Sequence, residues 1–158
     1  MNYKKVASLC MLILPWVSVP LLGKKSFVRY LPPATFASLS MIILSLIANR
    51  NNWWKNRNPL FPKTPIDFTY ILGAHFVTTL WVFTLTFGSF PLYLITNIIL
   101  DCINAFPFAG LWKRLGFFKF KRMSPSIYCL ITVLLAIFLY FYQHTLEKVV
   151  FNTNSSKY

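Results

Sequence analysis

The sequence predicts an all-α integral membrane protein, a helical bundle of about five transmembrane helices. Of its 158 residues, 56% are hydrophobic and only 12% are charged, about half the charged share of an ordinary soluble domain. The apolar residues form long blocks, and the charged residues lie between these blocks. This layout suits lipid as the solvent, because a helix satisfies its own backbone groups inside a bilayer. We therefore expect one transmembrane helical domain over 1–158.

Five apolar segments are expected to cross the membrane. These segments are 6–22, 32–48, 68–87, 90–106 and 127–142. The first contains Pro15 and Pro20, which predict a kink or frayed end. Pro32 and Pro33 are expected in the first turn of the second segment, where proline is tolerated. The first segment is thus the least regular of the five.

Gly88 and Ser89 predict a tight turn between the third and fourth segments. Read as one helix, 68–106 would be roughly forty residues long, about twice the ~20 residues that cross a bilayer. Pro91 fits the first turn of a new helix. The sequence therefore predicts a tight helical hairpin of the third and fourth helices.

A basic linker over 110–123 joins the fourth and fifth segments. Its apolar positions 111, 112, 115 and 118 share one helical face, which predicts a short interfacial helix. Its cations are expected to contact anionic lipid headgroups. These cations are Lys113, Arg114, Lys119, Lys121 and Arg122.

The distribution of basic residues predicts the orientation. With five spans, eleven basic residues fall on the side of the N-terminus and five on the other side. The positive-inside rule then places the N-terminus in the cytoplasm and the C-terminus outside. Lys24, Lys25 and Arg29, expected in a short loop, oppose the rule locally. If the first segment did not span, the N-terminal segment would also lie outside.

Composition excludes several functional classes. A net charge of +13 would suggest nucleic acid in a soluble protein, but here the basic residues flank apolar segments, so no nucleic-acid partner is expected. Cys10, Cys102 and Cys129 lie within apolar stretches and their spacing fits no metal site, which predicts buried free thiols. We expect no disulfide, metal or cofactor.

Two ionisable residues lie within the expected spans, His75 and Asp101. Such residues are costly in lipid, so each is a candidate functional residue. They lie at equal distances in sequence from Gly88, and an antiparallel hairpin would place them at similar depth.

Three further polar residues extend this intramembrane polar site. Thr79 is one turn from His75, while Asn97 and Asn104 share a helical face with Asp101. We expect this stripe to face the third helix or the bundle interior, because lipid would leave it without hydrogen bonds.

Two interpretations of the site remain open. In the structural one, His75 and Asp101 form a hydrogen-bonded or ionic pair that locks the hairpin. In the functional one, the pair is a protonatable relay or an ion site.

No catalytic motif occurs in the sequence, and three acidic residues and two histidines permit few catalytic sets. His144 and Glu147 are expected to be a solvated surface pair. We therefore do not expect an enzyme. We expect a structural, accessory or regulatory membrane component that acts through helix–helix contacts, as a homo-oligomer or within a larger complex. The alternative is a small transporter or channel component that uses His75 and Asp101.

Several short motifs carry a resemblance to a known family. They are Leu14-Pro15-Trp16, Leu22-Gly23-Lys24, the segment 27–32, Trp53-Trp54, the segment 97–107 and Lys113-Arg114. Over most of its length the chain resembles uncharacterised small multi-pass membrane proteins of Gram-positive, spore-forming bacteria. The resemblance implies a bacterial plasma-membrane protein and carries over no active residues.

Overall fold

The computed structural model describes residues 3–56, 60–61, 63–115 and 118–151, and it is mostly helical. The expectation of a helical protein is therefore confirmed. The α-helices are α1 (Tyr3–Val17), α2 (Val19–Arg50), α3 (Phe76–Thr86), α4 (Phe90–Ala105), α5 (Pro107–Leu115) and α6 (Pro125–Leu146). Two π-helical segments, η1 (Tyr70–His75) and η2 (Glu147–Phe151), and two short strands, β1 (Trp54–Asn56) and β2 (Phe118–Phe120), complete the described elements.

Among the described residues, three helical stretches are long and apolar enough to cross a membrane. They are Val19–Arg50, Phe90–Leu111 and Pro125–Val150. The apolar stretch Tyr70–Thr86 is shorter, and α1 has only 15 residues, below the ~20 that span a bilayer. The helices at the first and third expected spans are therefore shorter than those at the other three.

The helix α2 corrects the expected boundary between the first two segments. Lys24, Lys25 and Arg29 were predicted in a loop, but all three belong to α2. The helical path breaks only at Gly23, whose φ of 74° and ψ of 149° are not helical. Glycine adopts this positive φ without steric cost. The single break is thus one residue, and helix resumes at Lys24.

Pro32 and Pro33 also lie inside α2 and do not start a helix as predicted. Proline has no backbone N–H, so Pro33 cannot donate to the carbonyl of Arg29, four residues earlier. The side chain of Gln143 on α6 replaces this donor, with its Nε2 atom 3.3 Å from the Arg29 carbonyl oxygen. A residue 114 positions away therefore allows the helix to continue through the prolines.

Arg29 also binds Glu147 through its side chain. Its Nε lies 2.5 Å from Oε1 and its Nη2 lies 2.6 Å from Oε2, the two-point geometry that suits a guanidinium and a carboxylate. Gln143 donates to the same carboxylate at 3.1 Å. We call Arg29, Gln143 and Glu147 the α2–α6 clasp. The expected surface pair of His144 and Glu147 is replaced by this long-range ion pair.

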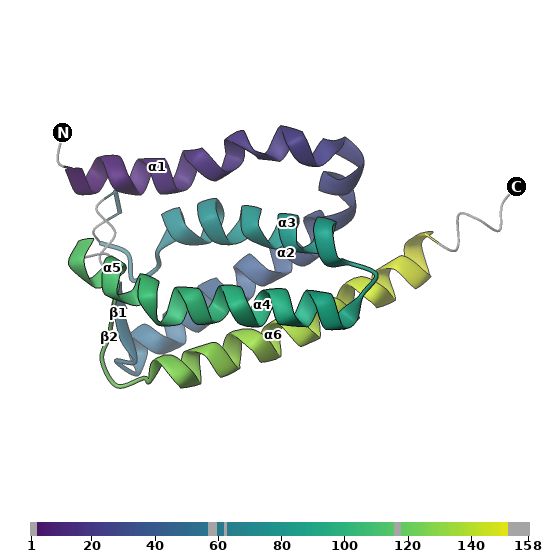
Figure 1. Ribbon diagram of the computed structural model, residues 1–158. Helices are drawn as coiled ribbons and strands as arrows, with labels where there is room; N and C mark the ends of the chain where they lie inside the picture. Colours follow the sequence, from purple (N-terminus) through teal and green to yellow (C-terminus); the bar gives the residue numbers. More distant parts are fainter. Residues whose placement is uncertain (1–2, 57–59, 62, 116–117, 152–158) are drawn as a thin grey trace, which may run out of the picture.

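The turn after α3 agrees with the sequence-based boundaries. α3 ends at Thr86 and α4 begins at Phe90. Gly88 has a φ of 111°, and the N–H of Ser89 donates to the carbonyl of Thr86 at 3.2 Å. α3 and α4 lie beside each other, as Figure 1 shows. The π-helical η1 that leads into α3 was not predicted.

The helix α1 packs against η1 at Gly73. A Cβ atom at Gly73 would lie 2.7 Å from the Cα of Leu12, so only glycine fits this contact. Beside it, the indole of Trp16 stacks on Phe76 with ring centroids 5.5 Å apart and donates to the Leu72 carbonyl at 2.9 Å. These contacts attach α1 to the rest of the bundle.

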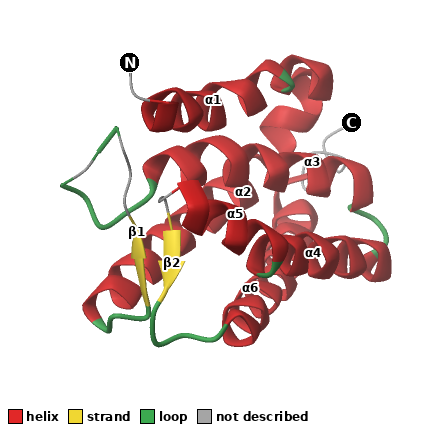
Figure 2. Ribbon diagram, turned by 60° about the vertical axis from the view of Figure 1, so that its left-hand side comes forward, coloured by secondary structure: helices red, strands yellow, loops and turns green. Residues whose placement is uncertain are grey.

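The basic linker differs from the interfacial helix predicted over 110–123. A helix forms earlier, as α5, and the segment after it becomes strand β2, which pairs antiparallel with β1. Figure 2 shows the two strands together at one edge of the helices. The two strands lie far apart in the sequence, so neither segment alone indicated the pairing.

The two ends of the bundle are visible in Figure 1. The N-terminus, α5 and the strands gather at one end, and the C-terminus and the turn between α3 and α4 lie at the other. Arg57 and Lys157, which were part of the charge count, lie outside the described residues. The five linker cations are all exposed; they are Lys113, Arg114, Lys119, Lys121 and Arg122.

Replacing Gly73 with alanine should lower the free energy of unfolding by about 1–3 kcal/mol, because the added methyl group overpacks the contact with α1. Gly110→Ala is the matched control, since a Cβ there meets no atom within 4 Å. Circular dichroism during denaturation in mixed detergents measures both variants. Wild-type stability of Gly73→Ala would contradict the close packing of α1 on η1.

Replacing Gln143 with leucine should lower the free energy of unfolding by about 1–3 kcal/mol, because the Arg29 carbonyl then loses its hydrogen-bond donor. In a Pro33→Ala background the same replacement should cost less, because residue 33 then has an N–H that reaches this carbonyl. A double-mutant cycle on the same denaturation assay measures the coupling. Additive effects would show that Gln143 does not compensate for Pro33.

Candidate functional site

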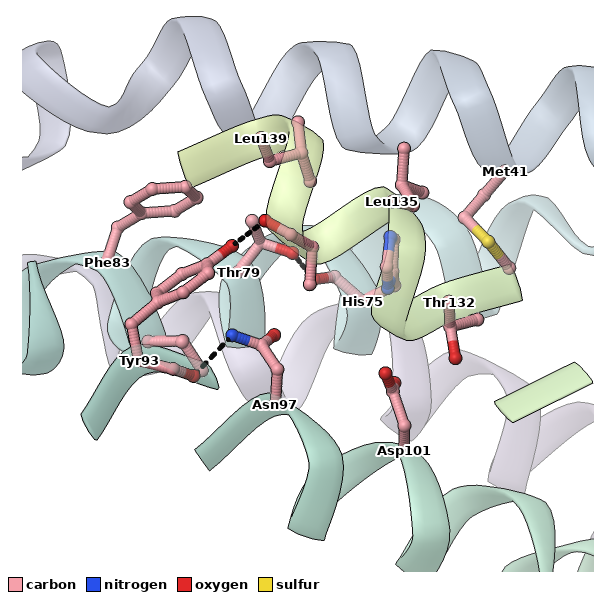
Figure 3. A pocket seen from close by; sticks show the side chains of 12 residues that line it. Met41, His75, Thr79, Phe83, Tyr93, Asn97, Asp101, Thr132, Leu135 and Leu139 are labelled. Atoms are coloured by element: carbon pink, nitrogen blue, oxygen red, sulfur yellow. Dashed lines mark hydrogen bonds between the residues drawn. The ribbon is translucent and has the colours of Figure 1, made fainter. Parts of the chain in front are cut away.

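A small polar cavity lies inside the bundle and contains most of the predicted polar site. Its volume is about 40 Å³, enough for at least one water molecule. Figure 3 shows polar side chains from separate elements converging on it. The polar residues of its lining are His75, Thr79, Asn97, Asp101 and Thr132.

His75 reaches this cavity from the last position of η1. Its ring stacks on Tyr70 with centroids 6.0 Å apart. The Nε2 atom of His75 is buried and has no hydrogen-bond partner among the described residues. π-helical turns are rare and occur often at functional sites. His75 therefore lines the cavity while one of its ring nitrogens makes no hydrogen bond to the described residues.

Asn97 and Asp101 enter the cavity from α4, one turn apart. The amide of Asn97 donates to the Tyr93 carbonyl at 2.8 Å. The Tyr93 hydroxyl donates to the Ala136 carbonyl on α6 at 3.0 Å, so this edge of the cavity is fixed between the two helices. In Figure 3 the Asp101 carboxylate points into the space beside Thr132.

The structure brings together four of the five predicted site residues, namely His75, Thr79, Asn97 and Asp101. Asn104 does not line the cavity, and its amide donates to the Tyr70 hydroxyl at 2.5 Å. It shares a face with Asn97, but it lies about 10 Å further along the helix axis. The predicted stripe therefore divides into a cavity part and an η1–α4 contact.

One interpretation of the site required a hydrogen bond or an ion pair between His75 and Asp101. Within the described part of the chain neither exists. Sequence distance from the Gly88 turn sets the depth of each residue, whereas the rotation of each helix sets its direction. The two ionisable groups therefore line one cavity without bonding to each other.

Two residues of this site, Thr132 and Tyr93, were not predicted from the sequence. Thr132 contributes a hydroxyl from α6, and Tyr93 bridges α4 to α6. Thr132 is a single hydroxyl within an apolar run, so its type gave little signal. Tyr93 lies four residues before Asn97, and this spacing on one face could have indicated it.

The three cysteines are free in the structure, and their placement differs in part from the expected burial. Cys10 is exposed, and Cys102 and Cys129 are partly buried. The sulfur atoms of Cys102 and Cys129 lie 3.5 Å apart between α4 and α6. In the described part of the chain, no three metal-ligating side chains gather at one place.

Similarity to known proteins gives no indication of function. No protein-family model, no curated protein and no solved structure matches the chain. The polar cavity, the exposed basic end and the apolar helix faces are therefore the features from which a function can be argued.

Proposed function

We propose that the chain is a multi-pass membrane protein of the plasma membrane, with segments 6–22, 32–48, 68–87, 90–106 and 127–142 embedded and the third and fourth forming a hairpin. The three long apolar helical stretches support this placement. So do the many exposed large apolar side chains, such as Leu85 at 68% and Leu130 at 59% exposure. These side chains suit contact with lipid and would be costly in water.

In this proposal the N-terminus is cytoplasmic and the C-terminus is outside. The support is the gathering of α5, the strands and the N-terminus at one end of the bundle, which collects exposed basic residues there. The opposing basic group, 24–29, is less of an exception than its sequence suggests. Glu147 neutralises Arg29, and only Lys24 and Lys25 remain as unpaired cations there.

Within the membrane, the chain acts as a structural, accessory or regulatory component through helix–helix contacts, and it is not an enzyme. One observation carries this proposal. A pocket of about 390 Å³ lies between α1, α3 and α4. Its rim includes the exposed apolar residues Leu85 and Leu100, and its lining includes Thr78 and Thr96.

The hydroxyl groups of this pocket distinguish it from an ordinary lipid-facing surface. Of its hydroxyl groups, that of Thr86 donates to the Val82 carbonyl and that of Ser18 donates to the Pro15 carbonyl. Thr78 and Thr96 make no hydrogen bond within the described residues. Small residues with free hydroxyls favour close approach and hydrogen bonding of another helix in a bilayer. The occupant is therefore a transmembrane helix, from a second copy or from a partner protein.

Replacing Thr96 with tryptophan should fill the pocket and weaken the association roughly tenfold, a loss of about 1.4 kcal/mol. A tagged pull-down from mild detergent, followed by sizing of the recovered complex, measures the association and separates self-assembly from a larger complex. Ile95→Trp is the matched control, because this neighbour on α4 is 55% exposed and lies outside the pocket. Recovery of neither a second copy nor a partner by the wild type would reject the proposal.

A second candidate function is a small transporter or channel component, and the cavity of His75 and Asp101 favours it. The cavity has room for water, and a carboxylate and an unpaired imidazole nitrogen face it. Such groups within a membrane occur along proton and ion pathways. Five short helices make a poor pore alone, so this function also requires association of several copies.

Asp101→Asn should abolish proton flux while leaving the amount of folded protein unchanged, because it removes a titratable group that makes no ion pair in the described chain. Liposomes that contain the protein and a pH-sensitive dye measure this flux. His144→Gln is the control, since it removes an exposed ionisable side chain outside the cavity and should keep the flux. Loss of folded protein in Asp101→Asn and His75→Ala would favour a structural lock, and absence of wild-type flux would reject the transport function.

A further inference from the structure

The end of the bundle that carries the two strands presents an unusual pairing of charges. The register of β1 and β2 places Lys55 directly opposite Lys119. Directly opposed side chains in an antiparallel pair have Cβ atoms about 5 Å apart, and like charges there repel. Both lysines are exposed, and no described carboxylate forms an ion pair with either of them.

The opposite face of the same strands is fixed to the bundle by aromatic contacts. Trp54 is only 3% exposed and packs edge-on against Tyr128 of α6, with ring centroids 5.8 Å apart. Phe120 packs against the same ring at 5.7 Å. Side chains alternate along a strand, so Lys55 and Lys119 both project away from the bundle on a ribbon that cannot turn to separate them.

The segment after β2 places two more cations beside the lysine pair. The backbone N–H groups of Lys121, Arg122 and Met123 all donate to the Trp53 carbonyl, at 2.9, 3.2 and 3.3 Å. This hydrogen bonding wraps the segment around the start of β1 and holds two more exposed cations, Lys121 and Arg122, close to the lysine pair.

We propose that Lys55 and Lys119 hold the phosphate of an anionic phospholipid headgroup, with Lys121 and Arg122 beside it. The phosphate relieves the repulsion that the register imposes. The inference rests on the proposed membrane placement. β1 begins four residues after α2 ends, and α6 begins five residues after β2 ends. The ribbon therefore lies where two proposed spans leave the bilayer, at the depth of the headgroups, where a partly exposed tryptophan such as Trp53 is also favoured.

The test is native mass spectrometry of the full chain in detergent, titrated with phosphatidylglycerol or phosphatidylcholine. We expect the wild type to retain phosphatidylglycerol preferentially. The double variant Lys55→Gln, Lys119→Gln should bind it about thirtyfold more weakly, a factor of about five for each lysine. Lys55→Arg, Lys119→Arg should keep the binding, because it keeps both charges and shows that the ribbon tolerates substitution.

The matched control is Lys24→Gln, Lys25→Gln, which removes two exposed lysines at the other end of the bundle. An equal loss of binding in this control would reject the site in favour of diffuse attraction. Displacement of phosphatidylglycerol by millimolar inorganic phosphate would reject a lipid ligand. Alkaline carbonate extraction of membranes tests the placement separately. A chain that resists extraction but binds both lipids equally contradicts only the headgroup site, whereas an extracted chain contradicts the membrane placement.

Discussion

The α2–α6 clasp is the interaction on which the arrangement of the bundle depends most. Arg29 is bound at two places. Its carbonyl accepts a hydrogen bond from Gln143, and its guanidinium donates to Glu147, which lies one helical turn after Gln143. Without Gln143, the Arg29 carbonyl would lack the donor that Pro33 cannot supply. Because the clasp fixes α2 against α6, it also fixes the helix surfaces on which η1, α3 and α4 pack.

In the proposed orientation, the clasp also accounts for a basic segment on the side that the positive-inside rule disfavours. A guanidinium in a two-point contact with a carboxylate is no longer a free charge at the surface. Arg29 lies over the rings of Tyr30 and Phe87 at 5.4 and 5.6 Å, which adds a favourable contact for the cation. A charge count from sequence treats all cations alike, and only the fold shows which one is already paired.

Local rules of sequence predicted the helical class, the Gly88 turn and the bounds of α4, because turn and cap chemistry acts over a few residues. They failed where a distant partner decides, as at Pro33, whose missing donor comes from Gln143. They also failed for β1 and β2, since strands of three residues carry no alternation that could reveal a pairing. At the site, helical spacing correctly grouped Asn97 with Asp101. Spacing could not predict the rotation of α3 against α4. It therefore could not decide whether Asp101 bonds directly to His75.

The absence of a bond between His75 and Asp101 is relevant to the function of the cavity. A buried imidazole nitrogen without a partner costs about 1–3 kcal/mol, and an apolar residue of similar size would avoid this cost. The surrounding structure nevertheless holds the group in place: η1 widens the helix immediately before α3, Gly73 admits α1 beside it, and Tyr93 secures the opposite wall. A gap large enough for water, bordered by both groups, is compatible with the proposed transport or channel role and with a chain that works in an assembly.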